Sequence, residues 1–265
     1  MIEYMIALFL GLVEGFTEFL PISSTAHLLL LSHFFSFEAK EGSFAILVQM
    51  GAMGAIIHVY FQKILFLAQN FYKDSQARHF LIGLFLAFLP AVVIGLLLHD
   101  VIKSIFFVTP ILICCSLIIG GVILLIIDKL PLYFKYHKIE DFSWKECVLI
   151  GLAQCIAMIP GVSRSGATIV TAMLLGADKR TAAEFSFFLA LPTLMGACAL
   201  EIYKNHQDLA QNDMTLIAIG FCSAFVAAFA SIRFLLHYVT HQGFSLFAYW
   251  RILVGILGLS GLYFS

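Results

Sequence analysis

The chain has 265 residues, of which 62% are hydrophobic and only 12% are charged. Soluble domains typically contain about 45–50% apolar and about 25% charged residues, so this composition excludes an ordinary soluble domain and indicates a membrane protein. The formal net charge is −1. Because the sequence contains no basic tail or patch, we expect no nucleic-acid partner.

The first apolar stretch, residues 2–33, is interrupted by Pro21 and by the hydroxyl residues that follow it. Proline ends the preceding helix and can begin the next one. Each of the two resulting helices is too short to cross about 30 Å of hydrocarbon. The pattern predicts a re-entrant hairpin, which is tolerated at membrane depth where it is buried in protein or lines a cavity.

Six further stretches are apolar and long enough to span the bilayer. They lie at about 43–61, 80–98, 105–127, 181–201, 214–235 and 247–264. The longest polar break, from Asp128 to Glu146, separates the first three from the last three. Directly after this break, residues 146–175 repeat the interrupted pattern with Pro160-Gly161 at its centre, and they predict a second re-entrant hairpin.

The two halves, about 1–130 and about 144–265, resemble each other weakly, since residues 10–14 match residues 150–154. Each half contains one hairpin and three spans. Because three is odd, the second half must insert upside down relative to the first, which makes an inverted-topology repeat. We therefore predict a single membrane domain, 1–265: an all-α polytopic membrane protein of six transmembrane helices and two re-entrant helix–loop–helix hairpins.

The basic residues indicate the orientation. If the N-terminus is outside, the inside loops and helix ends hold Lys63, Lys73, Arg78, Lys129, Lys135, Lys138, Lys145, Lys179, Arg180, Arg233 and Arg251. The outside then holds only Lys40, Lys103 and Lys204. Positive charge favours the cytoplasmic side, so we expect both termini to face out.

Two carboxylates lie in the first interrupted stretch. Glu14 and Glu18 are four residues apart and therefore share one helix face. Charged groups in an apolar environment are costly unless a cation, a shared proton or water offsets them. A protonated or water-facing pair without function is one interpretation. The other is a divalent-cation site in which one carboxylate could serve as general base.

Polar residues follow Pro21 closely. Ser23, Ser24 and Thr25 occupy the expected N-cap and first turn of a helix, and His27 lies on nearly the same face as Ser24. Capping alone would explain one of the hydroxyls. A helix N-terminus also offers free N–H groups to a phosphate, so this segment is a candidate phosphate-binding and catalytic site.

The second break supplies Gly161, Ser163, Arg164, Ser165 and Thr168. Matching the two prolines pairs Ser24 with Ser163. A guanidinium at membrane depth needs an anionic partner, and its fork matches phosphate oxygens in pairs. The alternative is a structural ion pair between Arg164 and one of the two glutamates. Together, the two breaks suit a metal-chelated diphosphate.

At these residues the sequence resembles the undecaprenyl-diphosphate phosphatase family of the bacitracin-resistance type. The segment from Glu14 to His27 (E-G-F-T-E-F-L-P-I-S-S-T-A-H) is similar to its first signature, and the segment from Pro160 to Thr168 (P-G-V-S-R-S-G-A-T) to its second. The resemblance implies hydrolysis of undecaprenyl diphosphate to the monophosphate and inorganic phosphate, which recycles the lipid carrier of peptidoglycan synthesis and gives bacitracin resistance.

The resemblance also implies a bacterial plasma (inner) membrane location and a requirement for Mg²⁺ or Ca²⁺. The catalytic set that it implies is Glu14, Glu18, Ser24, His27 and Arg164, with the two glutamates as metal ligands. As phosphate-binding residues we expect Ser23, Thr25, Gly161, Ser163, Ser165 and Thr168. The expected partners are the polyprenyl diphosphate and membrane lipid, and a homodimer stays open.

The expected mechanism has two versions. Either Ser24 or a metal-bound water attacks the terminal phosphorus, while His27 acts as general base or acid. The main rival function is an inverted-repeat transporter of the polyprenyl lipid or of another anion. An intramembrane serine protease fits less well, because it would not need Arg164 and paired carboxylates. The polar content of the first hairpin predicts a cavity open to the periplasm or cell exterior.

Overall fold

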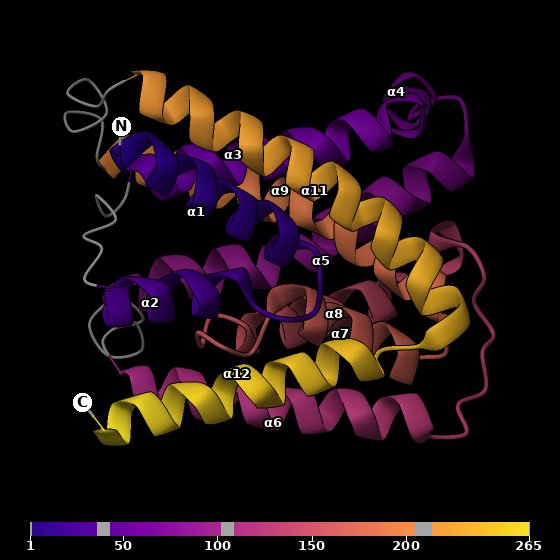
Figure 1. Ribbon diagram of the computed structural model, residues 1–265. Helices are drawn as coiled ribbons and strands as arrows, with labels where there is room; N and C mark the ends of the chain where they lie inside the picture. The colour runs from indigo at the N-terminus through magenta and orange to yellow at the C-terminus, as the bar shows by residue number, and fades with distance from the viewer. Residues whose placement is uncertain (1, 36–42, 102–108, 205–213, 265) are drawn as a thin grey trace.

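The computed structural model describes residues 2–35, 43–101, 109–204 and 214–264 (Figure 1). Its described elements are helical: α1 (Ile2–Glu18), α2 (Ser24–Phe35), α3 (Ser43–Val59), α4 (Phe61–Gln69), α5 (Ser75–Val101), α6 (Pro110–Lys129), the short 3₁₀ helix η2 (Ile139–Asp141), α7 (Trp144–Ile156), α8 (Arg164–Leu174), α9 (Lys179–Lys204), α11 (Met214–Gln242) and α12 (Ser245–Phe264).

Among the described helices, five are long and apolar enough to cross a membrane, namely α5, α6, α9, α11 and α12. The predicted span at 43–61 corresponds to α3, which ends at Val59 and bends by 73° into α4; taken together, the bent pair would be a sixth span. Between this span and the one predicted at 80–98, residues 62–79 lie mostly in α4 and in the first turns of α5.

The apolar side chains that the helices do not bury face outward. In α5, only 22% of the apolar stretch is buried inside the protein. Its side chains Phe85, Val93, Leu96 and Leu97 are more than half exposed. Large continuous apolar surfaces are rare on soluble monomers. The chain is therefore a multi-pass membrane protein whose outer surface contacts lipid.

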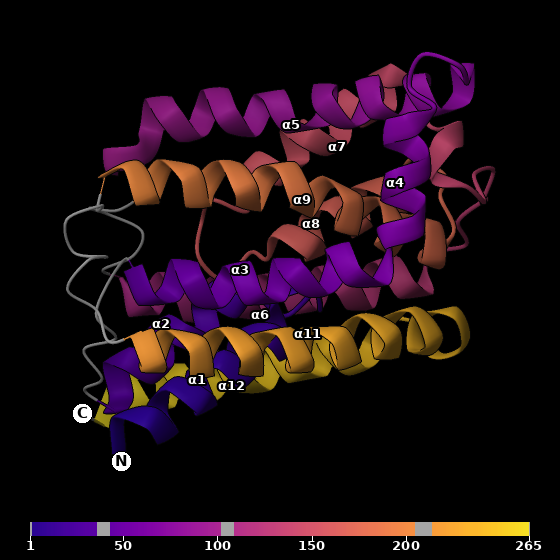
Figure 2. The same ribbon diagram turned by 90° about the horizontal axis from the view of Figure 1, so that it is seen from above.

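Helices of the two halves pack on each other. The first hairpin helix, α1, packs on α11, and its counterpart α7 packs on α5, while α6 and α12 form a pair (Figures 1 and 2). Glycines allow α1 to lie close to α11 and α7 to lie close to α5. A Cβ at Gly15 would lie 2.3 Å from the carbonyl oxygen of Ala224, and one at Gly151 would lie 2.2 Å from that of Ala87.

Two helix–turn–helix units lie where the sequence predicts its two breaks. Residues 19–23 connect α1 to α2, and residues 157–163 connect α7 to α8. In Figures 1 and 2, α1 and α2 extend from the end of the molecule that holds both termini, whereas α7 and α8 extend from the opposite end. Their turns approach each other inside the bundle.

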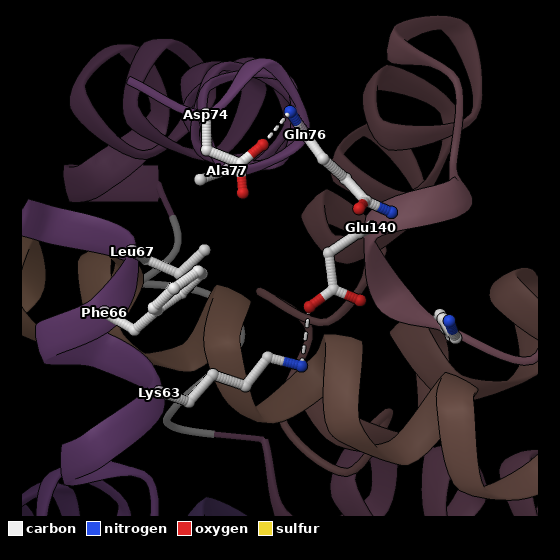
Figure 3. Close-up of a pocket in the computed structure, with 8 residues that line it drawn as sticks. Lys63, Phe66, Leu67, Asp74, Gln76, Ala77 and Glu140 are labelled. Carbon is white, nitrogen blue, oxygen red and sulfur yellow. Dashed lines mark hydrogen bonds and ion pairs between the residues drawn. The ribbon is translucent and has the colours of Figure 1, made fainter. Parts of the chain in front are cut away.

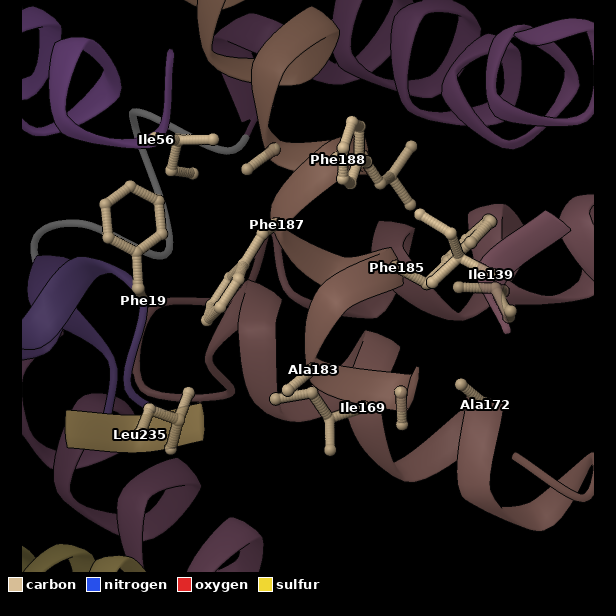
Figure 4. Packing of buried hydrophobic residues seen from close by; sticks show 14 of the residues in the cluster. Phe19, Ile56, Ile139, Ile169, Ala172, Ala183, Phe185, Phe187, Phe188 and Leu235 are labelled. Carbon is tan, nitrogen blue, oxygen red and sulfur yellow. The ribbon is translucent and has the colours of Figure 1, made fainter. Parts of the chain in front are cut away.

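Aromatic packing anchors the first turn. Phe19, the residue directly after α1, is fully buried and meets Phe187 of α9 edge to face, with ring centroids 5.7 Å apart. Ile56 and Leu235 belong to the same buried cluster (Figure 4). This packing fixes the C-terminal end of α1 and therefore the position of Glu18.

The connection before α7 is ordered. Tyr136 forms a parallel backbone bridge with Ala177, and the Nδ1 atom of His137 lies 2.7 Å from Asp178. Asp178 also accepts a hydrogen bond from the backbone N–H of Thr181 at the start of α9. Burial opposes ionisation of Asp178, but these hydrogen bonds hold its pKa below the usual value.

Candidate active site

Three predicted residues meet where the two turns approach each other. Glu18 is the last residue of α1, Ser24 is the first of α2, and Arg164 is the first of α8. The Ser24 hydroxyl donates a hydrogen bond of 2.5 Å to Glu18, and the Nη2 atom of Arg164 donates one of 3.1 Å to the other carboxylate oxygen. One carboxylate thus joins residues from both halves.

The second carboxylate lies one helical turn earlier. Glu14 is only 3% exposed and Glu18 is 8% exposed. Glu14 interacts electrostatically with both Glu18 and Arg164. The structure therefore contains the ion pair that the sequence offered as an alternative for Arg164, and it places both glutamates beside that one guanidinium.

Arg164 keeps one donor without a partner. Its Nη1 atom lies 3.5 Å from the carbonyl oxygen of Ser186, while its buried Nε has no acceptor among the described residues. Leaving a buried donor unpaired typically costs about 1–3 kcal/mol. An additional acceptor, such as a phosphate oxygen, would remove this cost.

The two turns share an unusual backbone conformation. Ser23 has a φ of 71° and Ser163 a φ of 75°, and each directly precedes the first residue of a helix. Left-handed backbone at a non-glycine residue is strained and is often found at functional sites. This geometry makes Ser23 the counterpart of Ser163, and hence Ser24 the counterpart of Arg164. Matching the two prolines in the sequence had paired Ser24 with Ser163, so the two alignments differ by one residue.

The hydroxyls of the second turn connect neighbouring segments. Ser163 caps α8 by accepting a hydrogen bond from the Gly166 N–H. Ser165 donates to the Leu20 carbonyl of the first turn at 2.8 Å. Thr168 contacts the Ser186 hydroxyl of α9 at 2.7 Å. Ser165 and Thr168 thus hold elements together, and Ser186 is a member of the site that the sequence analysis missed.

The remaining predicted residues lie around this cluster. Thr25 is partly exposed in the first turn of α2. Gly161 has a φ of 96°, and a Cβ there would lie 2.5 Å from the Ile113 carbonyl oxygen. Glycine is therefore required at this position by both conformation and space.

The ring nitrogens of His27 have partners other than Ser24 and Glu18. Its Nδ1 atom lies 2.8 Å from the Ser23 carbonyl oxygen, and its Nε2 atom accepts a hydrogen bond of 2.8 Å from the indole N–H of Trp250. These two contacts require a neutral ring with the proton on Nδ1. The hydroxyl proton of Ser24 points instead to Glu18.

The sequence places Arg251 among the charges of the inside loops and helix ends, and this prediction is wrong. The structure places it within α12, where it is only 1% exposed. Its guanidinium donates to backbone carbonyls of both turns. An arginine six residues into an apolar helix is the signal that could have revealed it, by the same reasoning that identified Arg164.

The oxygen donors present fit a divalent cation. Glu14, Glu18 and Ser24 lie together, whereas no group of three or more His, Cys, Asp or Glu side chains that could hold a metal occurs in the described part of the chain. Mg²⁺ is commonly bound by one or two carboxylates together with substrate phosphates. A shared site of protein and diphosphate oxygens suits this pair.

A separate pocket of roughly 220 Å³ lies between α4, the start of α5 and the segment around η2 (Figure 3). Two of its acidic side chains already have partners. Lys63 and Glu140 form an ion pair of 2.7 Å, and Asp74 accepts from the Gln76 backbone N–H. None of the three residues that join the two turns lines this pocket.

The model of a family described as bacitracin resistance protein BacA matches residues 7–257. The chain belongs to this family. An undecaprenyl-diphosphatase of Sinorhizobium medicae is 54% identical to it over 257 residues, which are 97% of this chain and 96% of that protein. Proteins named undecaprenyl-diphosphatase from Agrobacterium fabrum and Rhizobium meliloti are also 54% identical, over 256 and 257 residues respectively, with the same coverage. The BacA family match includes both turns.

Proposed function

We propose that this protein hydrolyses undecaprenyl diphosphate to undecaprenyl phosphate and inorganic phosphate. The observation that carries the proposal is the junction of Glu18, Ser24 and Arg164, where a hydroxyl, a carboxylate and a guanidinium from both hairpins meet. The names of the 54% identical relatives identify the lipid. The outward apolar surface suits a substrate whose prenyl tail lies in the bilayer.

Phosphate binding would fall to Arg164 and to the helix starts that follow the two turns. The unpartnered Nε of Arg164 and the first N–H groups of α2 and α8 provide donors for the phosphate oxygens. A bound substrate would compete with Glu18 for the guanidinium. Charge that develops on the phosphoryl oxygens in the transition state would be stabilised by the same groups.

Proton transfer would fall to the first hairpin. The hydrogen bond of Ser24 to Glu18 favours Ser24 as nucleophile with Glu18 receiving its proton. As the bond from Ser24 to the terminal phosphorus forms, the bond to the bridging oxygen would break and undecaprenyl phosphate would leave. Water would then hydrolyse the phosphoserine and release inorganic phosphate. A water that takes the place of the hydroxyl would lose its proton to the same carboxylate. His27, engaged by Ser23 and Trp250, would act by holding the start of α2.

We further propose that Glu14 and Glu18 hold Mg²⁺ or Ca²⁺. Such an ion would neutralise diphosphate charge and bring the carboxylates and the anionic substrate into one site. The close approach of the two buried glutamates supports this assignment, because a bound cation offsets their repulsion.

The distribution of charge suggests the orientation. Basic residues at the end of the bundle opposite the termini include Lys63, Lys129, Lys138, Lys145 and Arg180, and at the terminal end the described helices hold Lys204 (Figure 1). Lys40 and Lys103 lie outside the described residues. We propose that the basic end faces the cytoplasm of a bacterium and that both termini face the exterior.

In this orientation the two hairpins would be re-entrant from opposite faces, and the halves would form an inverted repeat. The exchanged packing of α1 on α11 and of α7 on α5 supports that symmetry. We propose that the site opens to the exterior. A cysteine at the partly exposed Thr25, in a background free of the six native cysteines, should react with an impermeant thiol reagent added to intact cells. Labelling only in inverted vesicles would contradict the outward opening.

The activity is tested by phosphate release from C₅₅ or shorter prenyl diphosphate by the purified protein, with and without EDTA. We expect release that EDTA abolishes and that added Mg²⁺ or Ca²⁺ restores. The Glu18→Gln variant is the control for contaminating phosphatases. Lipid movement across proteoliposomes without phosphate release would favour a transporter instead. A homodimer stays an open prediction, which the mass of the purified complex in detergent would test.

A further inference from the structure

Arg251 occupies the point at which the two turns meet the α6–α12 pair. Its guanidinium donates to the carbonyl oxygen of Pro21 in the first turn at 3.1 Å. It also donates to Gly161 at 2.7 Å and Val162 at 3.0 Å in the second turn. Two carbonyls of α6, those of Ser116 and Leu117, complete the set at 3.3 Å each.

Glycines leave the space that the Arg251 guanidinium occupies. A Cβ at Gly120 would lie 1.8 Å from the Nη2 atom of Arg251, and one at Gly166 would lie 3.1 Å from Nη1. No carboxylate pairs with Arg251 in the described parts of the chain. A guanidinium has five N–H donors in a rigid fork, so here it joins several carbonyls rather than neutralising one acid.

The carbonyls that Arg251 holds lie just before the reactive residues. Pro21 is three residues before Ser24, and Val162 is two residues before Arg164. Between them lie the left-handed residues Ser23 and Ser163. Strained conformations persist where the surrounding structure enforces them, and Arg251 is one side chain that restrains both turns.

We infer that Arg251 is a positioning residue for the hydrolysis proposed above, on which this inference rests. By holding both turns to α6, it sets the separation between Ser24 and Arg164. Misplacement of reacting groups by about 1 Å can cost about 10²-fold in rate. Arg251 therefore acts through the backbone of the turns without touching the substrate.

A pair of neighbouring glycines offers a matched test. Gly120→Ala would displace the guanidinium, because its methyl group occupies the Nη2 position. Gly121→Ala would instead press on the α6–α12 contact, at 2.7 Å from Ile252, 2.8 Å from the Ala248 carbonyl oxygen and 3.3 Å from the Cβ of Arg251, without displacing the guanidinium nitrogens. Arg251→Lys is the complementary variant, because it keeps the charge but loses the fork.

The measurement is kcat and KM for phosphate release from a prenyl diphosphate, per mole of folded protein judged by its gel-filtration peak. We expect Gly120→Ala and Arg251→Lys each to lower kcat by about tenfold or more, with KM within about threefold, and Gly121→Ala to keep kcat. If Arg251→Lys does not fold, Gly120→Ala still decides the outcome.

The same glycine variants are then made in an Arg164→Lys background, which separates positioning from loss of folded protein. Residues that act through one another are not additive. We therefore expect Gly120→Ala to cost less than about threefold there. Equal losses in both backgrounds, or equal losses from Gly120→Ala and Gly121→Ala, would overturn the inference. Absence of phosphate release by the wild-type protein would instead contradict the proposed function, and is seen before any variant is compared.

Discussion

The two hairpin turns end in the same backbone conformation, but the helices that follow them begin with different residues. In each, a serine with left-handed backbone, Ser23 or Ser163, precedes the first helical residue. That first residue is Ser24 in one hairpin and Arg164 in the other. The backbone is thus repeated, whereas the side chain placed at its functional position is not.

The first helices of the hairpins differ in the same manner. Where α1 carries Glu14, the matching position of α7 carries Gln154, which is also buried. The first hairpin therefore supplies acidic groups and a hydroxyl, and the second supplies a cation. Neither hairpin alone contains all the groups of the proposed diphosphate site. The proposed site therefore depends on both halves of the fold.

The largest effect is expected from Glu18→Gln, which removes the acidic group that joins the two hairpins. Ser24 would lose its proton acceptor and Arg164 its ionic partner. We expect kcat/KM for phosphate release to fall by about 10³-fold or more, which corresponds to roughly 4 kcal/mol. Glu3→Gln, at the exposed start of the same helix, is the matched control and should stay active. More than a tenth of wild-type activity in Glu18→Gln would argue against this role.

Arg164→Lys tests the contribution of the second hairpin. Lysine keeps the positive charge but cannot present two parallel N–H groups to a phosphate. We expect a loss of about 10²-fold in kcat/KM, similar to removal of one transition-state donor in other enzymes. Arg180→Lys, at an exposed ion pair with Glu184, should have little effect. Full activity of Arg164→Lys would show that this guanidinium does not grip phosphate.

Glu14→Gln makes α1 resemble α7 at the matched position. If the carboxylate is a metal ligand, the variant should lose about tenfold or more of its activity at limiting Mg²⁺ and recover part of it at high Mg²⁺. The measurement is a Mg²⁺ titration of phosphate release. Wild-type behaviour at limiting Mg²⁺ would remove Glu14 from the metal site.

The smallest expected effect concerns the shared backbone. Ser163→Ala keeps the strained φ and loses the cap on the Gly166 N–H, so it should destabilise the protein by about 1 kcal/mol. Ser163→Gly loses the same cap but tolerates positive φ, so its stability should stay closer to wild type. Thermal unfolding in detergent measures both. Equal stability of the two variants would mean that the left-handed conformation carries no strain.

Much of this molecule is readable from its sequence. The hydrophobic runs predicted the long helices. Pro21 and Pro160 predicted the two turns, because proline interrupts helix hydrogen bonding. The paired glutamates and Arg164 were identifiable because ionisable groups are costly in an apolar segment. The structure confirms that Glu18, Ser24 and Arg164 come together; their chemical roles stay predictions.

The tertiary contacts of other residues had no local signal, even where the residue itself could have been noticed. The contacts of Arg251 are with backbone carbonyls, which every residue possesses and no sequence pattern marks. The partner of His27 is Trp250, 223 residues further along the chain. The bend after Val59 was not predicted, because apolar residues continue across it to Phe61. These features depend on tertiary contacts rather than on local sequence.

The most direct test of a site shared by both hairpins is an experimental structure with Mg²⁺ and a methylene-bridged, non-hydrolysable prenyl diphosphate analogue. We predict that the terminal phosphonate lies between the Ser24 hydroxyl and the Arg164 guanidinium, with the metal on Glu14 and Glu18. The ion pair between Arg164 and Glu18 should be broken in that complex. Binding of the analogue at a place that only one hairpin lines, or in the pocket beside Lys63, would contradict the account.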